Sequence, residues 1–171
     1  MTNVDVAPRA AAAVLLLVAV APGHMLLQEA RFGAEPRPAS SSPITLSAND
    51  ALVWTVNPHD DSVAVIRADT NRVIANLAVG DEPRSIAVSP DDRIAYVANA
   101  ADASVTPIRI QNANPDRFRA RAGRAVVTGA EPWSVVVSPD GARTFLANSA
   151  EDTITVLRTD GGQVIGHVDL R

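Results

Sequence analysis

The densest group of side chains that could bind a ligand is a run of arginines in the second half of the chain. Arg117, Arg119 and Arg121 alternate with Phe118 and alanine, and Arg124 follows. Guanidinium groups bind phosphate and carboxylate in a bidentate manner, so the cluster could clamp an anionic partner. A solvated loop is the alternative, because no basic stripe continues beyond this run.

A second set of candidate binding residues stands in and near two similar sequence blocks. Arg84 follows Gly-Asp-Glu-Pro, and Trp133 follows Gly-Ala-Glu-Pro. Arg and Trp are enriched at the energetic centres of protein interfaces. Polar segments elsewhere contribute further candidates, namely His59, Asp60, Asp61, Asp102, Glu151 and Asp152. These acids could bind a partner, but Asp in short polar segments commonly stabilises a turn.

The sequence shows no pattern typical of a metal centre or a catalytic nucleophile. It contains no cysteine, and its histidines (His24, His59 and His167) are far apart and lack acids at ligand spacing. The Ser-Pro-Asp segments come with no base, and there is no Gly-rich phosphate loop or nucleophile elbow. We therefore expect no catalytic residue, no metal and no cofactor.

Charge and composition restrict the classes of partner. The formal net charge is −4, the pI is about 5.3, and aromatic residues make up 4% of the chain. An acidic chain with few stacking aromatics does not favour nucleic acid. Another protein, or a second copy of this chain, is the expected partner.

The N-terminus has the features of a secretion signal. A polar start is followed by an apolar run at residues 10–21 and by the small-residue segment Ala-Pro-Gly. Such a run covers about 18 Å as a helix, well short of a bilayer core of about 30 Å. We therefore expect a signal peptide at residues 1–23, a flexible linker at 24–43, no stable membrane span, and export to the periplasm or the medium. An uncleaved anchor is the alternative.

The remainder of the chain is repetitive. Residues 55–66 recur at 97–108, 42 residues later, and again at 146–157, a further 49 residues on. The block at residues 80–92 recurs at 129–141, also 49 residues later. Three units result, at about 44–84, 85–133 and 134–171. The second unit is longer because of an insertion that contains the arginine run.

Each unit predicts four short strands separated by turns. In the second unit these are residues 85–89, 94–98, 104–110 and 125–128, with turn signals such as Pro90-Asp91 between them. Four antiparallel strands every forty-odd residues is the spacing of a β-propeller blade. Pro107 stands where the other units have Val65 and Val156, so this strand is expected to bend or bulge.

Several blocks resemble the YVTN-repeat propellers, among them Tyr96-Val97-Ala98-Asn99 and the segment that runs from Thr70 to Asp92. The resemblance covers about three quarters of the chain. It implies an all-β fold of three propeller blades. Because every motif found is structural and repeated, and because the N-terminus has the features of a secretion signal, we expect an exported, non-catalytic scaffold for binding or protein interaction. A fragment of a periplasmic propeller enzyme, amine-dehydrogenase-large-subunit-like or lactonase-like, is the alternative that the resemblance leaves open.

The blade model also predicts where the candidate residues lie. Loops from fourth to first strands and from second to third strands share one rim, which would gather Arg84, Trp133 and the acids. Trp133 could instead cap the core between blades. The arginine insertion would lie at the opposite end. Closed propellers use about four to eight blades, so three would leave two open faces.

Overall fold

The computed structural model describes residues 42–171; the expected signal peptide and most of the expected linker lie outside these residues. The described residues form thirteen strands and contain no helix that could cross a membrane. The strands are β1 (Ile44–Leu46), β2 (Leu52–Asn57), β3 (Ser62–Arg67), β4 (Arg72–Ala78), β5 (Pro83–Val88), β6 (Ile94–Asn99), β7 (Ser104–Asn112), β8 (Arg119–Ala122), β9 (Val126–Val127), β10 (Pro132–Val137), β11 (Arg143–Asn148), β12 (Thr153–Arg158) and β13 (Gln163–Asp169).

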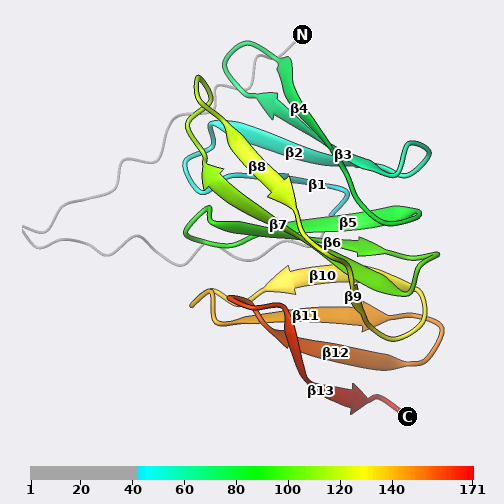
Figure 1. Cartoon of the computed structure of the whole chain (residues 1–171). Coiled ribbons are helices and arrows are strands. Elements are labelled where there is room, and N and C mark those ends of the chain that lie inside the picture. The colour runs from blue at the N-terminus through cyan, green and yellow to red at the C-terminus, as the bar shows by residue number, and fades with distance from the viewer. Residues whose placement is uncertain (1–41) are drawn as a thin grey trace, which may run out of the picture. The chain divides into compact units, whose positions relative to one another are not determined.

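Within residues 42–171 the strands form three antiparallel sheets, as predicted (Figure 1). Blade 1 has the order β1-β2-β3-β4 and blade 3 the order β10-β11-β12-β13. Blade 2 has the order β5-β6-β7-β8, and β9 also pairs with β7. Because β8 pairs with the second half of β7 and β9 with the first half, the two together take the place of one fourth strand.

The turns follow directly from the repeated polar residues. Asp92 and Gly141 occupy the same position of the first turn in their blades, with φ of 55° and 70°. Asp61 and Asp152 occupy the same position of the second turn, with φ of 47° and 53°. Asp and Gly tolerate this left-handed conformation better than most residues, which explains their recurrence there; blade 2 instead has Ala103, with φ of 49°, at the position of Asp61 and Asp152.

The arginine insertion is not simply a loop. Its residues Arg119–Ala122 form β8, a strand that is not among those predicted from the sequence. Ala120 and Ala122 face the buried cluster between blades 1 and 2, together with Phe118, whose ring meets Trp54 edge-on at 5.6 Å between centroids. Exposed Arg thus alternates with half-buried Ala, which is the pattern of a strand with one face towards the core and only small side chains on that face.

The strand that contains Pro107 is regular on its inner side and irregular on its outer side. β7 stays in register with β6 through the Tyr96–Pro107 pair, whereas the outer pairing is broken between β8 and β9. The carbonyl of Pro107 accepts from the N–H of Gly123 at 2.7 Å, so the backbone of Pro107 faces the outer strand. The outer pairs of blades 1 and 3 are also irregular at this position, after Val65 and Val156, so the irregularity belongs to the repeat and not to the proline alone.

The core lies between blades rather than inside one sheet. One buried cluster joins blades 1 and 2 and includes Trp54, Val65, Ile86 and Ile108. A second joins blades 2 and 3, and Tyr96 and Val105 are among its members from blade 2. Alternate residues of the fully buried β6 therefore serve two different interfaces.

The outer faces of blades 1 and 3 are not covered by any described strand. On blade 1 this face carries Ile44, Leu46 and Val73, which are 53%, 49% and 56% exposed. On blade 3 it carries Phe145, paired with Val156, and further half-buried or exposed apolar residues: Val136, Ala147, Ile154 and Val168. Two apolar sheet faces are consequently open within residues 42–171.

Tyr96 gives a direct spectroscopic test of the interface between blades 2 and 3. Its hydroxyl donates to the carbonyl of Thr159 at 2.7 Å, and burial raises the pKa of Tyr96 from 10.0 to about 12. A raised pKa stabilises the fold below pH 10, and this contribution is lost as the pH rises towards 12. Tyr96 is the only tyrosine, so phenolate absorbance should titrate near pH 12 in the native chain and near 10 in concentrated urea. A native midpoint near 10 would contradict this packing.

Candidate binding rim

The loops that carry the candidate residues meet along one edge of the blades. The carboxylate of Asp61 accepts from the N–H of Glu82 at 3.0 Å, which joins the second turn of blade 1 to the loop between β4 and β5. The carboxylate of Asp102 accepts from the N–H of Asp81 at 2.8 Å in the same loop. In blade 3 the N–H of Ser149 donates to the carbonyl of Glu131 at 2.9 Å. These loops are hereafter called the rim.

Arg84 and Trp133 both occupy a β-bulge. β5 pairs Pro83 with Asn99 and Ser85 with Ala98, so that Arg84 is the extra residue. β10 repeats the arrangement, and Trp133 is its extra residue. A bulge redirects a side chain out of the regular alternation of a strand. The first strands of blades 2 and 3 therefore turn these two side chains away from the sheet in the same manner.

The bulges bring Arg84 and Trp133 into contact. The guanidinium carbon of Arg84 lies 4.8 Å from the centroid of the Trp133 ring, which is a cation–π distance. Arg84 also pairs with the carboxylate of Glu82. The Arg84 side chain is 34% exposed and Trp133 is 53% exposed. The pair thus forms a partly exposed surface with a flat aromatic ring and a partly neutralised cation.

The residue before each bulge has a left-handed backbone. Glu82 and Glu131, each just before a proline, have φ of 55° and 50°. Non-Gly residues in this conformation cost of order 1 kcal/mol and persist where the surroundings fix them. The carbonyl of Glu82 accepts from the N–H of Ala100 at 3.0 Å. These two glutamates are not among the binding residues predicted from the sequence, although the repeated Gly-x-Glu-Pro blocks contain them.

The other predicted rim residues lie on the same edge but serve mostly in turns. Asp61 and Asp102 make the backbone contacts described above. Asp152 has a left-handed backbone, and its carbonyl accepts from the N–H of Leu170 at 2.9 Å. His59 and Asp60 are exposed in the turn after β2, and Glu151 is exposed beside Asp152. The structure therefore brings only Arg84 and Trp133 together as a pair of exposed anchors.

A buried asparagine ties the strands together beneath the rim. The side-chain amide of Asn99 donates to Ser104 Oγ at 3.0 Å and to Thr106 Oγ1 at 2.9 Å. Asn148 repeats both contacts with Thr153 and Thr155. The last residue of the Tyr-Val-Ala-Asn segment is thus a structural tie at the end of the second strand.

A glycine packs against the buried asparagine in blades 2 and 3. A Cβ on Gly80 would lie 2.4 Å from Asp102 and 2.5 Å from Asn99, and one on Gly129 would meet Asn148 at 2.5 Å. Only glycine fits so close to these side chains. The repeated Gly-x-Glu-Pro block therefore supplies both the packing on the buried asparagine and the bulge at the rim.

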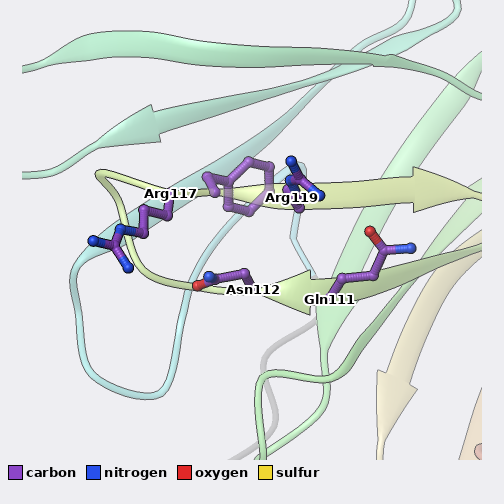
Figure 2. Close-up of a pocket in the computed structure, with 5 residues that line it drawn as sticks. Gln111, Asn112, Arg117 and Arg119 are labelled. Atoms are coloured by element: carbon purple, nitrogen blue, oxygen red, sulfur yellow. The ribbon is translucent and has the colours of Figure 1, made fainter.

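The arginines of the insertion lie away from the rim. β7 starts at Ser104, which pairs with Asn99 at the rim end, so its far end and β8 lie at the opposite end of the blade. Arg117, Arg119 and Arg121 are exposed. Figure 2 shows Arg117 and Arg119 around an open hollow that Gln111 and Asn112 also line.

No group of three or more potential metal ligands gathers within residues 42–171. His59 is exposed, and Nδ1 of His167 lies 3.3 Å from Thr155 Oγ1. His24 lies outside the described residues.

Solved structures of other proteins resemble this arrangement of three sheets. No protein-family model and no curated protein matches the sequence, but solved structures do. Hydrazine synthase from Kuenenia stuttgartiensis aligns with a TM-score of 0.66 and 25% identity, over 80% of this chain and 38% of that one. A protein from Bacteroides uniformis, provisionally described as a 6-phosphogluconolactonase, gives 0.65 and 16% over 77% and 41%.

A third structure carries the fold in its description. The β-propeller domain of Cps50 (Swd1) from Myceliophteria thermophila aligns with a TM-score of 0.61 and 11% identity, over 77% of this chain and 41% of that one. This chain spans about two fifths of the length of the three structures. Its three antiparallel sheets are β-propeller blades, similar to those of hydrazine synthase and of lactonase-like proteins.

Proposed function

We propose that this chain is an exported, non-catalytic binding module of the YVTN-repeat type, and that it binds a protein partner through its rim. The observation that carries this proposal is the Arg84–Trp133 pair, which two equivalent β-bulges turn out of neighbouring blades to a distance of 4.8 Å. The YVTN-like segment and the apolar N-terminal run support the family and the export.

The chemistry of the pair favours a protein partner over a small anion. Glu82 neutralises much of the charge of Arg84, so a free anion gains little there. A rigid indole stacked on a guanidinium instead offers apolar area together with remaining N–H donors. Arg and Trp anchors of this kind dominate the binding energy of many protein interfaces. The surrounding turn acids give the rim a polar border, as interfaces generally have.

The module is further proposed to complete its ring with a second copy. Phe145 and Ile154 occupy in blade 3 the positions that Tyr96 and Val105 occupy in blade 2, where they are buried against blade 3. Ile44 occupies in blade 1 the position of Ile86, which is buried against the preceding blade. Blade 1 of one copy on blade 3 of another would thus repeat an interface that the chain already contains.

A photocrosslinking experiment in the producing cell tests the rim. A benzophenone amino acid replaces Trp133 in one variant and Arg93 in the control, since the Arg93 side chain is 84% exposed in the turn between β5 and β6, at the opposite end of blade 2 from the rim. We expect a discrete protein adduct from position 133 and none from position 93. Equal adducts from both positions, or none from position 133, would contradict the proposal.

A propeller enzyme fragment is the second candidate, because two similar solved structures are provisionally described as 6-phosphogluconolactonases. Sequence identity to them is 16% and 15%, at which only the fold is shared. Hydrolysis of 6-phosphogluconolactone by the purified chain discriminates the two functions. The binding module should give the uncatalysed rate. Catalysis abolished by changes at Arg84 would establish the enzyme instead.

A further inference from the structure

A second surface, at the end of blade 2 opposite the rim, carries concentrated positive charge. Arg109 on β7 stands directly opposite Arg121 on β8, and Arg119 lies two residues along β8 on the same face. Directly opposed side chains in an antiparallel pair are about 5 Å apart at Cβ. Residues two apart on a strand are about 7 Å apart. Three guanidinium groups are therefore placed within reach of one small ligand. We call this surface the arginine ribbon.

The charge of the ribbon is not compensated by acids. Within residues 42–171, no carboxylate lies within ion-pair distance of Arg119 or Arg121, and Arg109 has only a long contact of 3.5 Å to the carbonyl of Asp160. Like charges directly opposite each other destabilise a strand pair. The chain carries this local repulsion although its net charge is −4. An incoming anion would relieve it.

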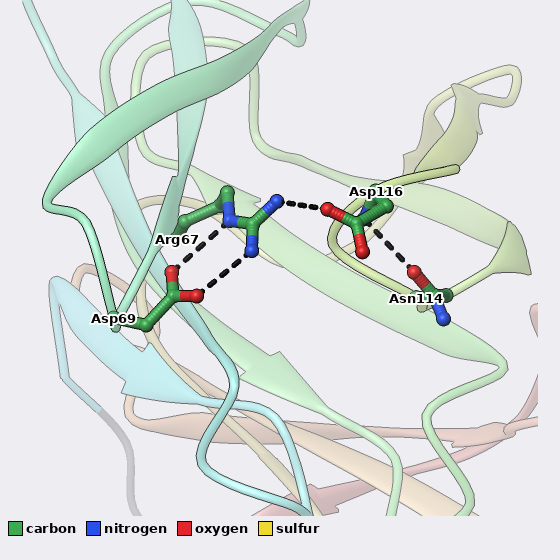
Figure 3. A network of polar contacts seen from close by, with 4 residues as sticks. All are labelled: Arg67, Asp69, Asn114 and Asp116. Carbon is green, nitrogen blue, oxygen red and sulfur yellow. Dashed lines mark hydrogen bonds and ion pairs between the residues drawn. The ribbon is translucent and has the colours of Figure 1, made fainter.

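The ribbon is anchored rather than free. Phe118, immediately before β8, packs edge-on against Trp54 of blade 1 with an interplanar angle of 69°. Figure 3 shows the second anchor, in which Arg67 of blade 1 pairs with both Asp69 and Asp116. The same guanidinium lowers the pKa of Asp69 to about 2, so the Arg67–Asp69 pair within blade 1 is charged at neutral pH. Asp116 is thus held by blade 1.

The neighbouring hollow adds uncharged hydrogen-bonding groups. Gln111 and Asn112, at the end of β7, line it together with Arg117 and Arg119 (Figure 2). The side-chain amides can donate to oxygens that the guanidinium groups do not reach. The ribbon and the hollow are continuous through Arg119, which belongs to both.

We propose that the arginine ribbon binds a ligand with several adjacent phosphate groups, such as a condensed phosphate chain. Each guanidinium can bind phosphate oxygens in a bidentate manner, and three of them so close together match an anion whose charges follow one another without intervening uncharged groups. This site lies at the other end of the blade from the rim and does not depend on the proposed protein partner.

Titration calorimetry of the full chain at low salt with inorganic tripolyphosphate tests the proposal. We expect binding at least tenfold tighter than that of orthophosphate or citrate. The R119Q/R121Q variant should lose at least tenfold in affinity. The control variant, R72Q/R93Q, removes the same charge from exposed arginines outside the ribbon and should bind as the unchanged chain does. Both variants should melt as the unchanged chain does, since exposed substitutions change stability by within about 0.5 kcal/mol.

Three results would overturn the proposal. Equal losses in the two variants would mean that only net charge attracts the anion. Citrate binding as tightly as tripolyphosphate would mean that the ribbon does not select adjacent phosphates. No measurable heat with tripolyphosphate at millimolar concentration would mean that the ribbon is not an anion site. None of these results bears on the rim, because Arg84 and Trp133 are unchanged in both variants.

Discussion

Replacing Asn99 with alanine is expected to lower the free energy of unfolding by about 3 kcal/mol, because two buried hydroxyl groups lose their shared donor and a cavity remains. Ser104 and Thr106 are 5% and 3% exposed, so water does not readily replace the amide. Urea unfolding followed by tryptophan fluorescence measures the change.

Blade 1 supplies a matched control. Asn57 occupies the equivalent position but is only half-buried and donates to Ser62 alone, because Ala64 stands where blade 2 has Thr106. The same substitution at Asn57 should therefore cost about 1 kcal/mol. Equal losses at the two positions, measured at one protein concentration, would show that the second contact of Asn99 contributes nothing.

Much of the fold follows from local patterns that the sequence displays openly. The repeated blocks have the same hydrophobic alternation and the same turn residues, so the predicted strands at 85–89 and 94–98 nearly coincide with β5 and β6. The left-handed positions of Asp92 and Gly141 explain why the turn signals were reliable. Because the blocks repeat, a strand or turn predicted in one unit also supports the same prediction in the other two.

β8 was missed because its signal is weak in isolation. Its inward residues are alanines, which have low strand propensity, and its outward residues are charged. What secures β8 is a long-range contact between Phe118 and Trp54, two residues in different blades. A single-segment pattern cannot contain such a contact.

The position of the rim residues could be predicted from the sequence, but their contact could not. Loop connectivity in a blade places Arg84 and Trp133 on one edge, and the structure agrees. Their direct contact depends on two β-bulges, which arise where Pro83 and Pro132 begin their strands after a left-handed glutamate. The arginine ribbon depends on strand register, since only the pairing of Arg109 with Arg121 adds a third cation.

The open blade faces predict that the chain associates with itself at micromolar concentration. Two copies would give six blades and close both faces by one symmetric arrangement. Each fully buried aliphatic side chain contributes about 1.5–3 kcal/mol, and several apolar residues line each face. An aspartate at Ile44 or Ile154 should abolish association, because it places a charge in the centre of the contact. Val127→Asp, on the outer strand β9, is the control.

Light scattering coupled to size-exclusion chromatography measures the mass of the chain in solution and is the most direct test of its self-association. The unchanged chain and the Val127→Asp variant should each be dimers, with twice the chain mass of 17.9 kDa. The Ile44→Asp and Ile154→Asp variants, measured separately, should each be monomers of 17.9 kDa. A mixture of these two aspartate variants should recover dimers, because one of its two contacts joins an unaltered blade 1 to an unaltered blade 3. A stable monomer of the unchanged chain, with cooperative unfolding, would contradict the account.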